Sequence, residues 1–305
     1  MLTMAACLAL AACEDKAPVV PPAPAAPSMP AALVGTPDFC GNNAYVHCAN
    51  ICDIGPRPSG SDGYAKQLDY LEKHLHAAGW KTAKDSFRLS NGISMTNLRA
   101  TFGSGEHTRP LLISCHIDTK VGISDDFVGA DDGASAAAAM LELARVLAKD
   151  AAKAEKIEFI FLDGEESFAP RMTETDGLYG SKFDVARRKG ELPTWQINLD
   201  MVGGRNKIIA IPGLQTSDFM YAHYSQAVRN LGLSAERWTV LPGNIMDDHL
   251  PYLRAGVDSI NLIAYFSDSN WWHTTRDNMS RICPKSLQES GDITLQLIKQ
   301  LFAAF

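Results

Sequence analysis

The sequence predicts a single α/β domain, in which a mixed but mostly parallel central sheet carries helices on both faces. Short continuous apolar runs alternate along the chain with segments of helical periodicity, which is the pattern of βαβ units. Hydrophobic residues make up 46% of the 305 residues, enough for a sizeable core. No apolar run beyond the first residues approaches the roughly 20 residues that a helix needs to span a bilayer.

The individual elements follow from these patterns. A helix is expected over residues 61–78, where apolar side chains recur at helical spacing from Tyr64 to Leu75. Leu111–Cys115 and Ile157–Leu162 are short apolar runs, as expected of strands that are buried on both faces. The other predicted strands lie near 85–90, 95–102, 195–202, 208–211 and 257–263, and the other predicted helices cover 133–149, 177–189, 217–231 and 285–303.

The first residues resemble a bacterial export signal. Residues 1–12 are apolar and lead to Leu10-Ala11-Ala12-Cys13, which resembles a lipoprotein cleavage box with Cys13 as the lipid-bearing residue. An ordinary secretory peptide is the alternative. Residues 14–37 contain seven prolines among alanines and are expected to form an extended linker. We therefore expect a catalytic domain at 38–305 that is exported to the bacterial periplasm or envelope and touches the membrane only through Cys13.

Charge and cysteine content narrow the possible partners. The formal net charge of −7 argues against a nucleic-acid binder, which usually presents a basic face. An exported protein could pair some of its cysteines, and a disulfide among Cys40, Cys48 and Cys52, or from them to Cys283, is left open. A zinc knuckle in this cluster is disfavoured because no fourth ligand stands at a suitable spacing.

A pair of glutamates directly follows one of the predicted buried strands. Ile157–Leu162 leads into Asp163-Gly164-Glu165-Glu166. Adjacent carboxylates at the end of a buried strand are costly unless a positive charge offsets them, and a divalent metal ion is the simplest such charge. One glutamate could then bind the metal while its neighbour transfers protons.

Further potential ligands follow the other strands, and the carboxyl ends of neighbouring parallel strands meet at one edge of a sheet. They are His116 and Asp118 after Leu111–Cys115, Asp132 before the 133–149 helix, Asp200 in the strand from Trp195, and His273 after the strand at 257–263. Each has a simpler explanation when taken alone, since Asp132 could cap its helix and His116 could be a hydrogen-bonded core residue. Together, carboxylate and imidazole donors predict a zinc site with a position open for substrate.

With these residues, the chain resembles the zinc aminopeptidase superfamily and, within it, the glutaminyl cyclases of animal and bacterial type. The resemblance runs from about residue 38 to the end. The segments that carry it are His116-x-Asp118, Gly129-Ala130-Asp131-Asp132, Asp163-Gly164-Glu165-Glu166-Ser167-Phe168, Leu178-Tyr179-Gly180-Ser181, Leu199-Asp200, Asp247-Asp248-His249-Leu250-Pro251-Tyr252-Leu253-Arg254 and Trp272-His273-Thr274. The resemblance implies an aminopeptidase-like α/β/α sandwich that cyclises N-terminal glutaminyl residues of peptides to pyroglutamate and releases ammonia.

The resemblance also implies roles for the site residues. Asp132, Glu166 and His273 would hold one zinc ion, and Glu165 would be the general acid and base. Asp200 and Asp247 would form a carboxylate hydrogen-bond network beside the reacting atoms. Trp272, Ile245 and Phe266 would line the substrate pocket. His116 and Asp118 would either bind a second ion or contact the ligands of the first. Asp248 and His249 would contact the ligands without binding the metal.

One departure and two alternative functions accompany this interpretation. Arg171 stands near the place where some cyclases carry a tryptophan, so one pocket wall is expected to differ. A dinuclear zinc aminopeptidase would hold a second ion on His116 and Asp200, with Asp132 bridging, and hydrolyse peptide bonds. A non-catalytic binding protein could keep the same fold, but the intact ligand set and Glu165 argue against it.

Overall fold

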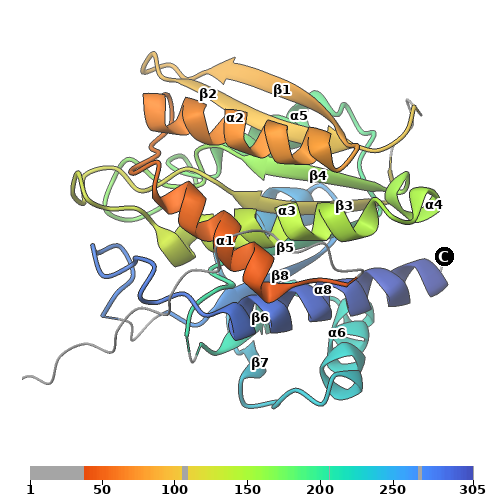
Figure 1. The fold of residues 1–305 in the computed structure, drawn as a ribbon. Coiled ribbons are helices and arrows are strands. Elements are labelled where there is room, and N and C mark those ends of the chain that lie inside the picture. The colour runs from red at the N-terminus through yellow and green to blue at the C-terminus, as the bar shows by residue number, and fades with distance from the viewer. Residues whose placement is uncertain (1–37, 105–108, 206, 267–269, 305) are drawn as a thin grey trace, which may run out of the picture.

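The computed structural model describes residues 38–104, 109–205, 207–266 and 270–304 (Figure 1). The predicted signal peptide with Cys13 and the predicted linker at 14–37 lie outside the described residues. Within these ranges, no helix has both the length and the apolar character that crossing a membrane requires.

An eight-stranded mixed sheet forms the centre of the described part of the chain, in the order β1-β2-β4-β3-β5-β8-β6-β7. The strands are β1 (Lys81–Arg88), β2 (Ser94–Thr101), β3 (Leu111–His116), β4 (Ile157–Leu162), β5 (Trp195–Asp200), β6 (Ile209–Pro212), β7 (Trp238–Leu241) and β8 (Asp258–Ala264). The central strands β4, β3, β5 and β8 are parallel, whereas β2 and β6 pair antiparallel with β4 and β8. The predicted α/β class with a mostly parallel mixed sheet is confirmed.

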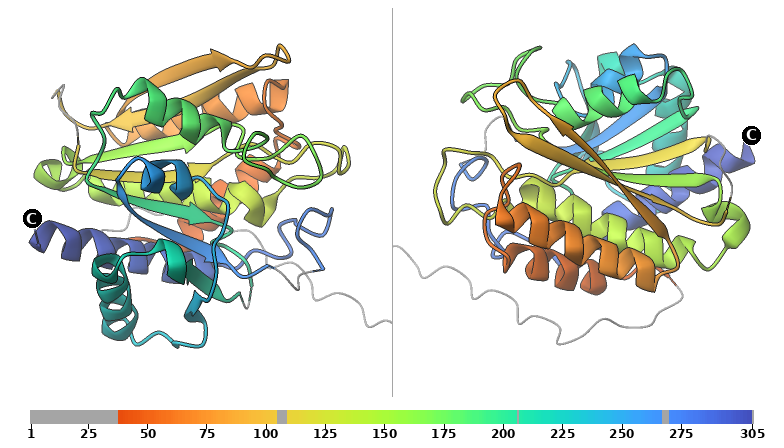
Figure 2. Two further views of the ribbon diagram at one scale, coloured as in Figure 1. Left: turned by 180° about the vertical axis from the view of Figure 1, so that it is seen from behind. Right: turned by 90° about the horizontal axis from the view of Figure 1, so that it is seen from above.

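Helices cover both faces of this sheet. They are α1 (Gly41–Cys52), α2 (Asp62–Ala77), α3 (Ala136–Leu147), α4 (Ala151–Ala154), α5 (Tyr179–Arg187), α6 (Asp218–Asn230), α7 (His249–Arg254) and α8 (Pro284–Ala303), with the turns η1 (Ala130–Ser135) and η2 (Gly213–Gln215). Helices α1, α2, α3 and α8 lie on one face, and α5 and α7 lie on the other (Figure 2). The first and last helices pack together, since Gly41 N donates to Gln288 Oε1 at 2.7 Å.

The two central strands β3 and β4 show why the sequence needs continuous apolar runs. All of their residues are buried because helices cover both faces of the sheet. Successive side chains of a strand point to opposite faces. Leu111 and Ile113 of β3 accordingly join the main core, whereas Leu112 packs with Ile160 and with Tyr252 of α7 in a second, smaller core.

The sequence pattern does not predict α1, β7 or α7. Helix α1 is buried nearly all round, with polar Asn43 and His47 among its buried residues, so it lacks the apolar stripe of an amphipathic helix. β7 and α7 are too short to show a clear period. The five described cysteines are free, so none of the disulfides that the sequence left open is present among them.

Candidate functional site

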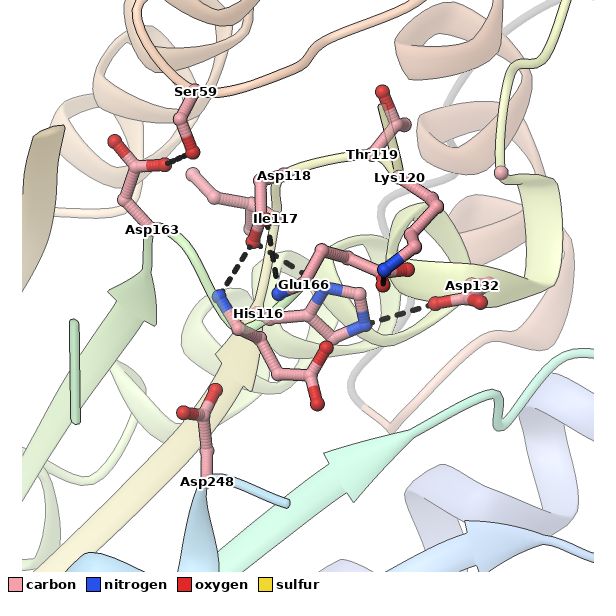
Figure 3. A network of polar contacts seen from close by, with 12 residues as sticks. Ser59, His116, Ile117, Asp118, Thr119, Lys120, Asp132, Asp163, Glu166 and Asp248 are labelled. Atoms are coloured by element: carbon pink, nitrogen blue, oxygen red, sulfur yellow. Dashed lines mark hydrogen bonds and ion pairs between the residues drawn. The ribbon is translucent and has the colours of Figure 1, made fainter. Parts of the chain in front are cut away.

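The carboxyl ends of β3, β4, β5 and β8 meet at one edge of the sheet, and the predicted ligands lie there. Figure 3 shows His116, Asp132 and Glu166 among them. His116 is the last residue of β3 and Asp200 is the last residue of β5. The glutamate pair follows β4, His273 lies in the loop after β8, and Asp132 belongs to the turn η1. Residues far apart in the sequence are thus brought together by the parallel arrangement of their strands.

Asp132, Glu166 and His273 form the first group with metal-binding geometry. His273 Nε2 lies 3.0 Å from Glu166 Oε1 and 3.4 Å from Asp132 Oδ2. Ligand atoms from the three residues all lie within 4.8 Å of one another. The two carboxylates are buried, while the His273 side chain is 17% exposed. The group therefore sits at the inner end of an open site, where a bound ion could also meet a substrate.

His116, Asp132 and Asp200 form a second group that meets the same distance limit. His116 Nε2 lies 3.1 Å from Asp132 Oδ1 and 3.3 Å from Asp200 Oδ1. Asp132 is shared, with Oδ1 near His116 and Oδ2 near His273. The arrangement is therefore able to hold one ion or two.

The electrostatics of the site fit a divalent cation. Burial raises the pKa of Glu165 well above its ordinary value, and the charge of Glu166 adds to the effect. Burial also raises the pKa of Asp200 to about 7. It lowers the pKa of His273, but ion pairs with Asp132 and Glu166 outweigh it and raise that pKa to about 9. More negative charge is buried here than the imidazoles balance, and carboxylate oxygens with imidazole nitrogens are donors that suit zinc.

Asp118 supports the glutamate pair from behind. Its two carboxylate oxygens accept the backbone N–H groups of Glu165 and Glu166 at 3.1 and 3.2 Å (Figure 3). Gly164 makes the preceding bend with a φ of +69°, and a Cβ there would lie 2.6 Å from Met95 Sδ. Asp118 belongs to neither ligand group, and it orients the residues that carry the neighbouring carboxylates.

Two further buried side chains, Lys120 and Asp163, hold the loop after β4 through contacts that the sequence does not predict. Lys120 Nζ donates to Ser167 Oγ at 2.6 Å and to the Ala169 carbonyl at 2.9 Å, and it lies 3.5 Å from Glu166 Oε2. Asp163 accepts a hydrogen bond from Ser59 Oγ at 2.6 Å (Figure 3). No local pattern marks these contacts, because each joins segments that are distant in sequence.

Asp277 links the two loops that carry His273 and Asp132. Its carboxylate oxygens accept the backbone N–H groups of Asp131 at 2.8 Å and of Asp132 at 3.0 Å. Asp131 Oδ1 in turn accepts the N–H of Gly203 at 2.8 Å, which ties the turn to the end of β5. Asp277 was not predicted as a site residue, although its position four residues after His273 could have indicated one.

A pocket of about 730 Å³ opens beside the two ligand groups. The predicted pocket residues Trp272, Ile245 and Phe266 all line it. The Trp272 ring stacks on the His273 imidazole with ring centroids 3.8 Å apart and lies 4.6 Å from the Phe266 ring. One wall of the pocket is therefore aromatic and begins directly at a candidate ligand, while Glu165 and Asp200 also line the cavity.

The Asp247-Asp248-His249 run lies behind this pocket. Asp247 accepts hydrogen bonds from the side chains of Asn198 at 3.1 Å and Asn261 at 2.7 Å, which come from β5 and β8. Asp248 and His249 are buried as well. None of the three is among the described residues that line the pocket, so they contact its lining rather than its interior.

Known proteins resemble this chain along most of its length. The family model for peptidase family M28 matches residues 97–298. Glutaminyl-peptide cyclotransferase-like protein of Bos taurus is 31% identical over 279 residues, covering 78% of this chain and 70% of the relative. Glutaminyl-peptide cyclotransferase of Gloydius blomhoffii is 32% identical over 271 residues, covering 73% of this chain and 71% of the relative.

Solved structures show the same likeness. Glutaminyl cyclase of Porphyromonas gingivalis superimposes with a TM-score of 0.78 at 26% identity, covering 86% of this chain and 99% of that chain. A Zn-dependent exopeptidase from Parabacteroides distasonis gives a TM-score of 0.76 at 27% identity, covering 87% of this chain and 99% of that chain.

The contacts of Asp277 lead to a prediction about metal affinity. Asp277→Asn should weaken zinc binding by about 10- to 100-fold, the usual effect of losing a group that orients a ligand. An asparagine keeps one acceptor oxygen and turns an NH₂ group toward the N–H of Asp131 or Asp132. Competition with a chromophoric chelator measures the affinity. Asp150→Asn, at the exposed start of α4, is the matched control, and unchanged affinity in a folded Asp277→Asn protein would contradict the positioning role.

Proposed function

Because the chain belongs to peptidase family M28 and, within it, to the glutaminyl-peptide cyclotransferases, we propose that it cyclises N-terminal glutaminyl residues to pyroglutamate. The observation that carries the proposal is the composition of one pocket. It combines a metal-binding group, an aromatic wall, and a buried glutamate, Glu165, that belongs to neither ligand group. Such a site can polarise an amide, hold its side chain, and move a proton beside it.

We assign one zinc ion to Asp132, Glu166 and His273. When bound, zinc supplies a Lewis acid that polarises the side-chain amide carbonyl of the substrate. The three donors are brought within 4.8 Å of one another by three separate loops, so the ion also joins these loops. His116, which also contacts Asp200, would then support Asp132 at the oxygen that His273 does not contact.

Positioning supplies much of the rate in this proposal, because the nucleophile is the α-amine of the same glutaminyl residue. An intramolecular attack is fast when the reactive conformation is fixed. Trp272, Phe266 and Ile245 would pack along the aliphatic part of the glutaminyl side chain and restrict its conformations. The amine nitrogen then lies close to the side-chain amide carbon, and the new C–N bond closes the ring.

Glu165 would transfer the proton. The attacking amine loses a proton to the Glu165 carboxylate, and the carboxyl group returns it to the departing amide nitrogen, so that ammonia leaves as the amide C–N bond breaks. Burial raises the pKa of Glu165, which strengthens this group as a base and lets it hold the proton between the two steps.

Asp200 and Asp247 would complete the polar network. Asp200 lines the pocket, where it would accept a hydrogen bond from the substrate amine. Its Oδ1 lies 3.3 Å from His116 Nε2. Asp247 is buried and fixed by Asn198 and Asn261, and its negative charge contributes to the raised pKa of Asp200. We therefore treat Asp247 as a residue that acts through Asp200.

A dinuclear zinc aminopeptidase is the second candidate function. The observation that favours it is the group His116, Asp132 and Asp200, which has its own metal-binding geometry. A structural neighbour is also described as a Zn-dependent exopeptidase. Two ions would be able to activate water for peptide hydrolysis, and the two functions therefore differ in the product that they release.

We also propose that the protein is held at the bacterial envelope by a lipid on Cys13. The support is the sequence Leu10-Ala11-Ala12-Cys13 followed by the proline-rich residues 14–37. At about 3.1 Å per residue, such a linker would reach roughly 70 Å from the membrane.

The product formed from one peptide separates the two reactions. Incubation of a Gln-led peptide with the zinc-loaded protein should reduce the peptide mass by one ammonia, and a strong chelator should stop the change. Mass spectrometry measures both products. Release of free glutamine would contradict the proposed cyclisation and support the aminopeptidase, and full activity with stripped metal would contradict the assignment of zinc.

Glu165→Gln should lower kcat by at least about 100-fold, because proton transfer by a positioned group contributes roughly 10²- to 10⁴-fold. Zinc content should stay at the wild-type level, since Glu165 is outside both ligand groups. Ammonia release and metal analysis provide the two measurements. Glu174→Gln, at an exposed ion pair with Arg254, is the matched control, and near-wild-type turnover of Glu165→Gln would refute the proton-transfer role.

Cys13→Ser should move the protein from the membrane fraction to the soluble fraction of a bacterial host. A serine cannot accept the thioether-linked lipid, whereas the catalytic domain is unchanged and should keep its turnover. Fractionation followed by immunoblotting measures the shift. A variant that stays in the membrane fraction would rule out anchoring through Cys13.

A further inference from the structure

Among the described residues that line the pocket, one exposed side chain at its mouth is charged. The exposed lining residues are Pro170, Arg171, Pro242, Asn244 and Tyr265. Lys120, another cation of the lining, is buried, and its ammonium is bonded to Ser167 and Ala169. Among the exposed residues that the structure places in the pocket lining, Arg171 is thus the charged one.

The guanidinium of Arg171 is available to a ligand. No ion pair or hydrogen bond of this side chain is found within the described part of the chain. The acidic residues that follow it in sequence have other contacts. Glu174 pairs with Arg254 at 2.7 Å, and Asp176 accepts the backbone N–H groups of Phe168 and Ala169 at 2.8 Å.

The segment that leads to Arg171 is fixed at the pocket. Lys120 holds it through Ser167 and the carbonyl of Ala169, and Asp176 holds it through the N–H groups of Phe168 and Ala169. These bonds end two residues before Arg171. The fixed backbone therefore positions Arg171 at the mouth of the pocket, where its side chain is exposed.

We propose that Arg171 makes the enzyme prefer peptides with an acidic residue directly after the N-terminal glutamine. The inference rests on the proposed function, which places the glutaminyl residue at the inner end of the pocket. The rest of the peptide must then leave through the mouth, where an acidic side chain meets an unpaired guanidinium beside proline, asparagine and tyrosine. A basic side chain meets the same charge and is repelled.

The preference should be modest and sensitive to salt. Exposed ion pairs are weak, and their measured strength corresponds to roughly a two- to fivefold change in an equilibrium or a rate. Because salt screens exposed charges over about 10 Å at 0.1 M ionic strength, the preference should shrink as the ionic strength rises. All of the peptides share the N-terminal glutaminyl residue, so the carboxylates at the inner end of the pocket affect them equally. Differences between the peptides therefore measure the effect of Arg171 on the residue that follows.

The test measures kcat/KM for peptides that begin Gln-Glu, Gln-Gln and Gln-Lys and are otherwise identical. The wild type should prefer Gln-Glu over Gln-Gln by roughly two- to fivefold. Arg171→Gln should remove the preference, and Arg171→Glu should reverse it in favour of Gln-Lys. Arg88→Gln, at an exposed position on the outermost strand β1, removes the same charge elsewhere and should leave the preference intact.

Two failures of this test have different meanings. If all three peptides are cyclised with ratios that Arg171→Gln and Arg171→Glu do not change, the role of Arg171 is wrong while the proposed function stands. If none of the peptides releases ammonia, the proposed function is wrong and this inference is lost with it.

Discussion

The burial of negative charge at one edge of the sheet is the constraint on which this structure depends. Asp132, Glu165, Glu166 and Asp200 are all less than one-tenth exposed and lie around one pocket. Carboxylates in such a place are stable only if hydrogen-bond donors and positive charge surround them. The protein supplies two histidines and Lys120 beside these carboxylates, and a ligand geometry that fits a divalent ion. Asp118 and Asp277 in turn accept the backbone N–H groups of the residues that carry three of them. Most of the unusual features of the sequence, from Gly164 to Asp277, serve this arrangement.

The sequence predicts the ligands because they lie where the apolar run of a buried strand ends. A buried parallel strand is a continuous apolar run, so a carboxylate or imidazole at its end is conspicuous, as at His116 and Asp200. The residues behind the ligands are less visible. Asp118, two residues after His116, was identified from the sequence. The supporting contacts of Lys120 and Asp163 were not, because their partners Ser167 and Ser59 are identified only when the chain is folded. Helix α1 was missed for a related reason, since burial on all sides removes the stripe that marks a helix.

The ligand set by itself does not choose between the two candidate reactions. Asp132 offers one oxygen to each ligand group, so the same carboxylate serves a site for one ion or for two. The distinction lies in the aromatic wall that starts at Trp272 and in the sequence similarity to cyclotransferases along most of the chain. Chemistry in this family is thus decided by the pocket as much as by the metal ligands.

The contact between α1 and α8 has a consequence for how the polypeptide is made. Gly41 and Gln288 stand near opposite ends of the described chain, yet they are joined by a hydrogen bond of 2.7 Å, and the two helices cover the same face of the sheet. During synthesis the first helix emerges from the ribosome long before the helix on which it docks. The main core therefore closes only after α8 has been synthesised, and until then the nascent polypeptide keeps this face open.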